Sequence, residues 1–132
     1  MESIESLIKK IVLCAYEVRK VLKPGYLESI YKNAMFLELK QQGLKVSTEV
    51  PFHVTYKGHV LGNFRADIVV EDRVILELKA IEHLNKAHEI QLVNYLMTTG
   101  IDVGLLINFG CLESFEIKRK YRVYKPKGST SY

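Results

Sequence analysis

Apolar residues recur at steps of three and four positions in three parts of the chain, which is the spacing of an amphipathic helix. The pattern predicts one helix over residues 4–22, ended by the Pro-Gly pair at 24–25, and a second over about 26–43. A third helix is predicted after Asn85, a residue type that caps helices, and should end at Gly100. Two helices therefore precede the first predicted strand.

The other segments are rich in β-branched and aromatic residues, which favour strands. A nearly all-apolar run is typical of a strand covered on both faces, whereas alternation is typical of a more exposed strand. The first three predicted strands follow one another across short turns, so they should form an antiparallel meander. The strands are expected at 46–56, 59–70, 74–79, 103–109 (all apolar) and 115–124 (alternating). The predicted fold is an α/β sandwich with a mixed sheet and the order α-α-β-β-β-α-β-β.

Length and composition narrow the class of protein. A chain of 132 residues suits one domain, with an N-terminal helix in 1–24 and a basic strand and tail in 118–132. With 48% hydrophobic and 26% charged residues, the chain can bury a core, which argues against intrinsic disorder. The first ten residues mix charges with apolar side chains, and no run approaches the roughly 20 apolar residues of a membrane span. We expect a cytoplasmic protein without membrane contact.

The cysteines and histidines carry no recognisable ligand spacing. Cys14 and Cys111 lie far apart without a CxxC pair, which favours reduced thiols that serve packing. His53, His59 and His83 likewise lack metal-like spacing and are interpreted as ordinary strand and loop residues.

The net charge of +4 is concentrated at the C-terminal end. Residues 118–132 contain six basic side chains, no acidic ones and interleaved tyrosines, so the segment could attract a polyanion such as nucleic acid. The alternative is a charged edge strand and solvated tail, in which lysines deter edge-to-edge pairing. The six residues are Lys118, Arg119, Lys120, Arg122, Lys125 and Lys127.

Three polar residues in the predicted third hairpin form the first candidate site. Glu77 and Lys79 share one face of a strand because they are two positions apart. If the turn is centred on Asp72, with a three-residue connection, Asp67 lies directly opposite Glu77. Opposed Cβ atoms lie about 4.5 to 5.5 Å apart, so two carboxylates could hold one divalent cation. The alternative is a surface ion pair between Lys79 and one of the acids.

Three more residues have both an ordinary and a functional interpretation. Glu28 is an acid in the first turn of a helix, where the helix dipole favours negative charge, or a third carboxylate over the sheet. Gln91 and Tyr95 lie one helical turn apart, either as a polar stripe or as site residues.

Together these residues resemble a known family. The stretch Gly-Tyr-Leu-Glu-Ser-Ile-Tyr at 25–31 resembles the signature of the GxxExxY protein family, within the PD-(D/E)xK nuclease superfamily. Asp67, the Glu-Leu-Lys triplet at 77–79 and Gln91 with Tyr95 in QxxxY spacing agree with this superfamily. The resemblance covers about 25–109, with Ala66 in place of the proline of the PD pair.

The resemblance implies a site for Mg²⁺ or Mn²⁺ surrounded by Glu28, Asp67 and Glu77, with the Leu78 carbonyl as a further ligand. Hard oxygen donors are those that Mg²⁺ prefers. Lys79 would position the attacking water and stabilise the transition state, while Gln91 and Tyr95 would orient phosphate or the carboxylates. These roles predict a metal-dependent nuclease.

Two rivals remain, a noncatalytic nucleic-acid-binding module and a protein-interaction module that keep the nuclease fold. The sequence leaves open DNA or RNA as substrate, internal or terminal cleavage, one metal or two, and a homodimer.

Overall fold

The structure is a computed structural model, and it describes residues 1–123 of the chain. The element order is the predicted one. The helices are α1 (Ile4–Leu22), α2 (Glu28–Gln41) and α3 (Lys86–Thr99). The strands are β1 (Val46–Tyr56), β2 (His59–Val70), β3 (Val74–Lys79), β4 (Val103–Asn108) and β5 (Glu116–Tyr121).

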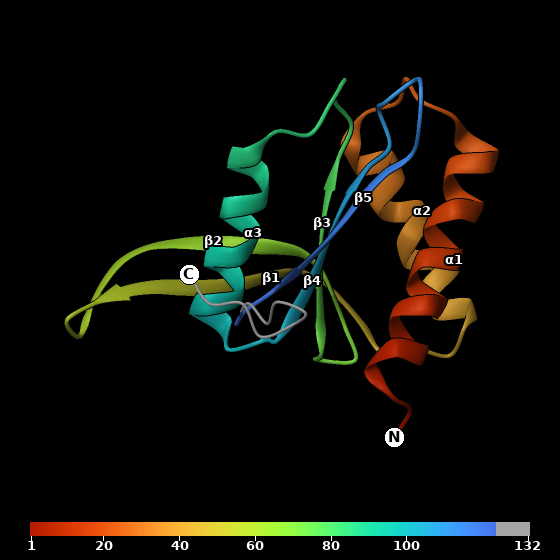
Figure 1. Cartoon of the computed structure of the whole chain (residues 1–132). Coiled ribbons are helices and arrows are strands. Elements are labelled where there is room, and N and C mark those ends of the chain that lie inside the picture. The colour runs from red at the N-terminus through yellow and green to blue at the C-terminus, as the bar shows by residue number, and fades with distance from the viewer. Residues whose placement is uncertain (124–132) are drawn as a thin grey trace, which may run out of the picture.

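All five strands form one mixed sheet in the order β1-β2-β3-β4-β5. β3 and β4 are parallel, with α3 as the crossover between them, and every other neighbouring pair is antiparallel. α1 and α2 lie together on one face of the sheet and α3 covers the other (Figure 1). β4 is buried along its whole length, as its apolar sequence predicted. β5 is an edge strand, in agreement with its alternating pattern.

Each face of the sheet has its own hydrophobic core. The larger core lies beneath α1 and α2, and the smaller one joins Leu92 and Leu96 of α3 to Val69, Ile75 and other residues of the sheet. A Cβ on Gly104 of β4 would lie 2.9 Å from the Leu92 Cδ1 atom, so the glycine allows α3 to pack closely on the sheet.

The predicted boundaries differ from the observed ones in α2, β4 and β5, and β4 ends at Asn108, one residue before its predicted end. α2 begins at Glu28 rather than near Tyr26, because Gly25 has φ 124° and Leu27 is extended, so the chain is not yet helical there. β5 ends at Tyr121, and Phe115 before it packs against the larger core instead of pairing. Tyr124, the predicted end of this strand, lies outside the described residues.

The helix ends use the predicted signals. Asn85 caps α3 by accepting a hydrogen bond from the His88 amide (3.2 Å), and His88 Nδ1 accepts one from the Asn85 amide (3.1 Å). Gly100 ends the helix in the left-handed conformation, with φ 75°. Within residues 1–123, none of the helices is long and apolar enough to cross a membrane.

β1 and β2 form a long hairpin that extends well beyond the rest of the sheet, on the side of α3 (Figure 1). Aromatic stacking ties it to that helix. The Phe64 ring of β2 stacks on Tyr95 of α3 with centroids 3.8 Å apart, and Phe52 of β1 stacks on Phe64 at 5.4 Å.

Candidate metal and nucleic-acid site

The carboxylates of Asp67 and Glu77 meet where β2 and β3 part. The register pairs Val70 with Val74 across a three-residue turn and Ile68 with Leu76, as predicted from a turn centred on residue 72. Strand pairing stops there, and side chains take over the next positions. The Leu78 amide donates to Asp67 Oδ2 (2.8 Å), and the Asp67 amide donates to Glu77 Oε2 (3.0 Å). The two acids are therefore held beside each other by the backbone of the opposite strand.

The electrostatics of these acids favour bound positive charge. Glu77 is only 7% exposed, and burial, followed by the charge of Asp67, raises its pKa to about 8. Burial also raises the pKa of Asp67, against the hydrogen bond from the Leu78 amide. The pKa of Glu28 is raised by burial and then by Asp67. Each acid is harder to ionise than usual because it is desolvated and has negative neighbours.

Two lysines compensate part of this negative charge. Lys79, at the end of β3, lowers the pKa of Glu28, Asp67 and Glu77. Lys32, one turn after Glu28 on α2, lowers the pKa of Asp67 and forms an ion pair of 2.7 Å with Glu49 of β1. The sequence did not point to this second lysine, since its nearness depends on how α2 lies against β1.

Glu28 is positioned by the other two residues of its sequence motif. Gly25 adopts φ 124°, a conformation that favours glycine, in the connection before α2. Tyr31 is fully buried, and its hydroxyl donates to the Lys23 carbonyl (2.5 Å) and accepts from the Tyr26 amide (3.1 Å). The tyrosine thus fixes the loop from which Glu28 starts the helix, a role that sequence reasoning did not assign.

The carboxylate oxygens of Glu28, Asp67 and Glu77 are suitable ligands for a hard divalent cation, although the three side chains are not in close contact. Within residues 1–123, oxygens of Glu28, Asp67 and Glu77 do not all lie within 4.8 Å of one another. Each of the two strand acids uses one oxygen to accept a backbone amide, while the described residues donate no hydrogen bond to the second. These second oxygens would be the ligands, and carboxylate oxygens are the donors that Mg²⁺ and Mn²⁺ take.

The two residues predicted on α3, Tyr95 and Gln91, lie in different surroundings. Tyr95 is half-buried by its stacking on Phe64, and burial and the charges of Glu77 and Asp67 raise the pKa of its phenol. Its hydroxyl therefore lies within the field of the acids. Gln91 is exposed and makes no hydrogen bond to the described residues.

The basic residues of the C-terminal part are mostly paired with acids of the same chain. Arg119 binds Glu5 of α1, Lys120 binds Glu89 of α3 (2.6 Å), and Arg122 binds Asp102 (2.8 Å). Lys125 and Lys127 lie outside the described residues. The structure therefore leaves less free positive charge on β5 than the sequence suggested.

Lys118 differs from its neighbours, because it is exposed and has no ion pair within the described residues. The register aligns it with Leu106 of β4 and Glu77 of β3, so all three share one face of the sheet. Two strand spacings separate Lys118 from Glu77, a distance of about 10 Å along the sheet. Arg119 points instead toward α1 on the opposite face.

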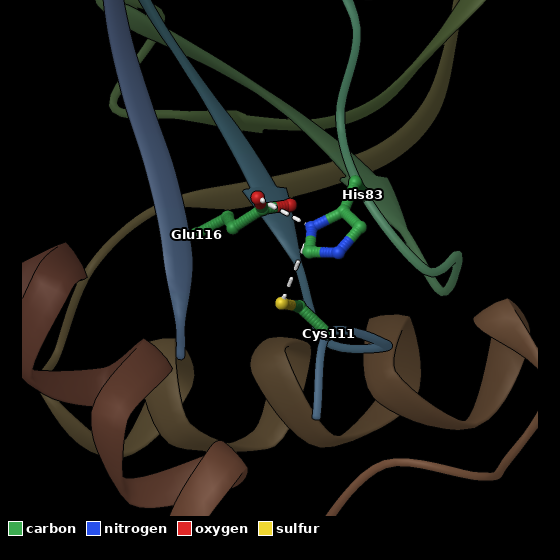
Figure 2. A group of neighbouring side chains, drawn as sticks. All are labelled: His83, Cys111 and Glu116. Carbon is green, nitrogen blue, oxygen red and sulfur yellow. Dashed lines mark hydrogen bonds and ion pairs between the residues drawn. The ribbon is translucent and has the colours of Figure 1, made fainter. Parts of the chain in front are cut away.

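A second polar cluster was not predicted. His83, Cys111 and Glu116 place one ligand-type atom each within 4.8 Å of one another, in the part of the chain that the structure describes (Figure 2). His83 lies in the segment after β3 and Cys111 is buried, as expected, but the sequence did not place the two side chains beside each other. Spacing along the chain could not reveal the cluster, because the residues come from the segment after β3, the segment after β4 and the start of β5. Asn108, the one polar residue in the apolar 103–109 run, was the available signal, and it hydrogen-bonds to Glu116.

Comparisons with known proteins agree with this architecture. The crystal structure of SSO0001 is similar, with a TM-score of 0.57 and 20% sequence identity over 70% of this chain and 48% of that one. This chain thus spans about half the length of that protein, and the likeness concerns the fold. No curated protein gave a significant match. The model of the PD-(D/E)XK nuclease superfamily matches residues 5–120, nearly the whole described chain. On this match, the chain belongs to the PD-(D/E)XK nuclease superfamily.

Proposed function

We propose that the chain is a divalent-metal-dependent nuclease that hydrolyses phosphodiester bonds in DNA or RNA, with residues 1–132 as one catalytic domain. The observation that carries the proposal is the pairing of Asp67 and Glu77 where β2 and β3 separate, with Lys79 two positions further along β3. Superfamily membership supports the same reaction class.

Without a cation, the negative charges of the carboxylates in this site are only partly compensated. A carboxylate with a pKa near 8, beside a second carboxylate, is stabilised when a divalent ion replaces the proton. Asp67 and Glu77 would hold Mg²⁺ or Mn²⁺ through their free oxygens, and Glu28 would approach from the start of α2. The backbone of Leu78 adjoins Asp67 through its amide, which supports its carbonyl as a further ligand. When bound, the ion supplies Lewis acidity toward the scissile phosphate and lowers the pKa of a coordinated water.

Lys79 would act on the reacting phosphate directly. Its ammonium group follows Glu77 on the same strand face and lies within the field of all three acids. Such a compact cation can orient the attacking water and offset the negative charge that develops on the phosphate oxygens. The aliphatic stem gives it the reach to contact substrate while Asp67 and Glu77 retain the metal.

Substrate positioning would fall to groups around the acids. Lys118, on the same face of the sheet as Glu77, would contact a flanking phosphate. Tyr95, and Gln91 one turn before it, would orient the backbone of the nucleic acid or the carboxylates. The exposed position of Gln91 favours contact with substrate over contact with the metal ligands.

We place the chain in the GxxExxY branch of the superfamily. The three motif residues have separable tasks that support this placement: Gly25 adopts the unusual backbone conformation, Glu28 brings the acid and Tyr31 fixes the connection.

The proposal is tested by incubating the protein with single- and double-stranded DNA and RNA in Mg²⁺, Mn²⁺ or EDTA. We expect metal-dependent cleavage by the parent protein, none in EDTA and none by Asp67→Ala. The matched control is Asp72→Ala, an exposed acid in the adjacent turn that pairs with Lys45; it should cleave like the parent.

Cleavage that survives EDTA or the loss of Asp67 would contradict the proposal. Binding of nucleic acid without cleavage under every condition would also contradict it, in favour of a noncatalytic binding module.

A further inference from the structure

Two loops bring a histidine, a cysteine and a glutamate together beyond the ends of β3 and β4. His83 belongs to the segment after β3, Cys111 to the segment after β4, and Glu116 begins β5. His83 Nδ1 lies 3.3 Å from Glu116 Oε2 and 3.7 Å from Cys111 Sγ. Figure 2 shows the three side chains directed toward a common point. We refer to these three residues as the loop cluster.

Among the described residues outside the loop cluster, hydrogen bonds reach only one oxygen of Glu116. Its Oε1 atom accepts from the Leu84 amide (2.9 Å) and from the Asn108 side-chain amide (2.9 Å). Its Oε2 atom is left to face His83. Asn108 is fully buried and also accepts, through Oδ1, from the amides of Ile81 (3.0 Å) and Gly110 (3.1 Å). A carboxylate that is fixed through one oxygen by surrounding protein groups, while the other oxygen faces further ligand-type atoms, is typical of a supported metal ligand.

The two loops can meet only because residue 110 is glycine. A Cβ at this position would lie 2.4 Å from the backbone nitrogen of Ile81, closer than real Cβ contacts. Cys111 follows directly and is fully buried, so its thiol is fixed against the first loop. The close approach of the His83 and Cys111 segments is thus built into the backbone.

The spacing within the loop cluster matches a tetrahedral zinc site. With Zn–S of about 2.3 Å and Zn–N and Zn–O of about 2.0 to 2.1 Å, ligand atoms at tetrahedral angles lie about 3.4 to 3.6 Å apart. The sulfur–nitrogen and nitrogen–oxygen separations in the cluster are 3.7 and 3.3 Å. Glu113 lies beside these three residues, with its Oε2 atom 3.7 Å from Cys111 Sγ and 3.5 Å from His83 Nε2, the ring nitrogen that is not directed at Glu116.

We propose that His83 Nδ1, Cys111 Sγ and Glu116 Oε2 bind Zn²⁺. A thiolate and an imidazole select zinc over Mg²⁺. The Cys111 thiol proton is released to solvent on binding, and the thiolate takes its place as ligand.

The proposed zinc site goes beyond the proposed nuclease function, but it lies close to Lys79, a residue of the proposed nuclease site. The register aligns Lys79 of β3 with Asn108 of β4 and Glu116 of β5. Zinc would therefore fasten the segment that directly follows Lys79 to the loop between β4 and β5. The two sites share no residue, so either can be lost without the other.

The competing explanation is a metal-free ion-pair cluster, in which a protonated His83 lies between Glu116 and Glu113 at 3.3 and 3.5 Å. Metal analysis and substitution separate the two explanations. The protein is stripped with a chelator and titrated with Zn²⁺, and with Co²⁺ as a spectroscopic probe of thiolate ligation. The variants are His83→Gln, whose side chain is exposed and replaceable, and Cys111→Ser, with Cys14→Ser as the matched control for a buried thiol.

We expect one Zn²⁺ per chain and a thiolate-to-cobalt charge-transfer band in the parent and in Cys14→Ser. The band should disappear in Cys111→Ser, and zinc affinity should fall at least 100-fold in His83→Gln. Zinc at 100 times its Kd should raise the Tm of the stripped parent by about 10 °C, and should leave His83→Gln unchanged.

Absence of zinc binding by the folded, stripped parent would overturn the proposal, as would unchanged zinc affinity in His83→Gln. Because Mn²⁺ titration reports on the acids of β2 and β3, failure of the zinc site is distinguishable from failure of the nuclease site.

Discussion

The three acids Glu28, Asp67 and Glu77, here called the acid cluster, and the loop cluster are built in opposite ways. The acid cluster has only oxygen donors, two of them on paired strands whose register fixes their neighbourhood. The loop cluster combines sulfur, nitrogen and oxygen from residues 28 and 33 positions apart. Donor chemistry therefore suits the acid cluster to the proposed Mg²⁺ or Mn²⁺ and the loop cluster to the proposed zinc.

The two clusters also differ in how their acids are satisfied. In the loop cluster, Glu116 receives two donors from the surrounding protein, and these bonds lower the pKa of its carboxyl group. In the acid cluster, burial and like charges raise the pKa of each carboxyl group instead. The carboxylate of the proposed zinc site is thus stabilised by protein groups, whereas the proposed hard-metal site keeps negative charge available for a cation. Four predictions test this contrast.

The largest effect is expected for Lys79→Met. The substitution removes a cation assigned to the transition state, so turnover should fall roughly 10²- to 10³-fold. Mn²⁺ affinity should stay similar or rise slightly, because a competing positive charge is gone. Single-turnover cleavage and Mn²⁺ titration measure the two quantities, with Lys45→Met as control, a lysine before β1 that pairs with Asp72. Cleavage at the parental rate would reduce Lys79 to an ion-pair partner.

The acid cluster should make stability without metal depend on pH. Folded Glu77 keeps its proton up to a pKa of about 8, whereas the unfolded chain releases it near 4.5. The stability that Glu77 contributes is therefore fully present below pH 4.5 and is lost as pH rises toward 8, by about 5 kcal/mol at most.

Urea unfolding in EDTA at several pH values measures this loss. Glu77→Gln should flatten the dependence over the window from pH 4.5 to 8, and saturating Mn²⁺ should restore stability to the parent at pH 8. A parent protein whose stability in EDTA rises through this window would contradict the assigned environment of Glu77.

Tyr31→Phe tests whether the sequence motif has a structural component. The change leaves the Lys23 carbonyl and the Tyr26 amide without their partner, which should cost about 1 to 3 kcal/mol of unfolding free energy. Tyr26→Phe, which alters an exposed ring, is the control and should change stability by less than about 0.5 kcal/mol. Equal stabilities of the two variants would contradict the role of the Tyr31 hydroxyl in fixing the connection before α2.

The smallest effect is expected at the sheet edge. If Lys118 contacts one phosphate, Lys118→Gln should reduce the slope of log affinity for duplex DNA against log salt by about 0.9. Lys120→Gln should have less effect, because the lysine is already paired with Glu89. Fluorescence anisotropy across a salt series measures both slopes. A larger change in Lys120→Gln would reverse the assignment.

Local patterns explain how much of the fold could be predicted. Hydrophobic periodicity and end signals such as Asn85 and Gly100 determine elements through nearby residues. The length of the β2–β3 turn then placed Asp67 beside Glu77, because strand register propagates from the turn. For these acids, strand register relates the distance along the sequence to the distance in space.

No such rule links His83 to Cys111, or Lys32 to Glu49. Their contacts depend on loop paths and on how helices lie on the sheet, which many residues determine together. The ion pairs of Arg119 and Lys120 were missed for the same reason, since Glu5 and Glu89 lie on helices remote in sequence. Net charge along a segment therefore overstated the positive charge available to nucleic acid.

The hard-metal site is tested most directly by calorimetric titration of Mn²⁺ into the parent, Asp67→Asn, Glu77→Gln, Glu28→Gln and His83→Gln. We expect Mn²⁺ binding to be lost in the two strand variants, weakened in Glu28→Gln and unchanged in His83→Gln. Both strand variants should unfold no more easily than the parent in EDTA, since each relieves a contact between like charges. Undiminished Mn²⁺ binding in Asp67→Asn and Glu77→Gln would contradict the assignment of a hard-metal site to the acid cluster.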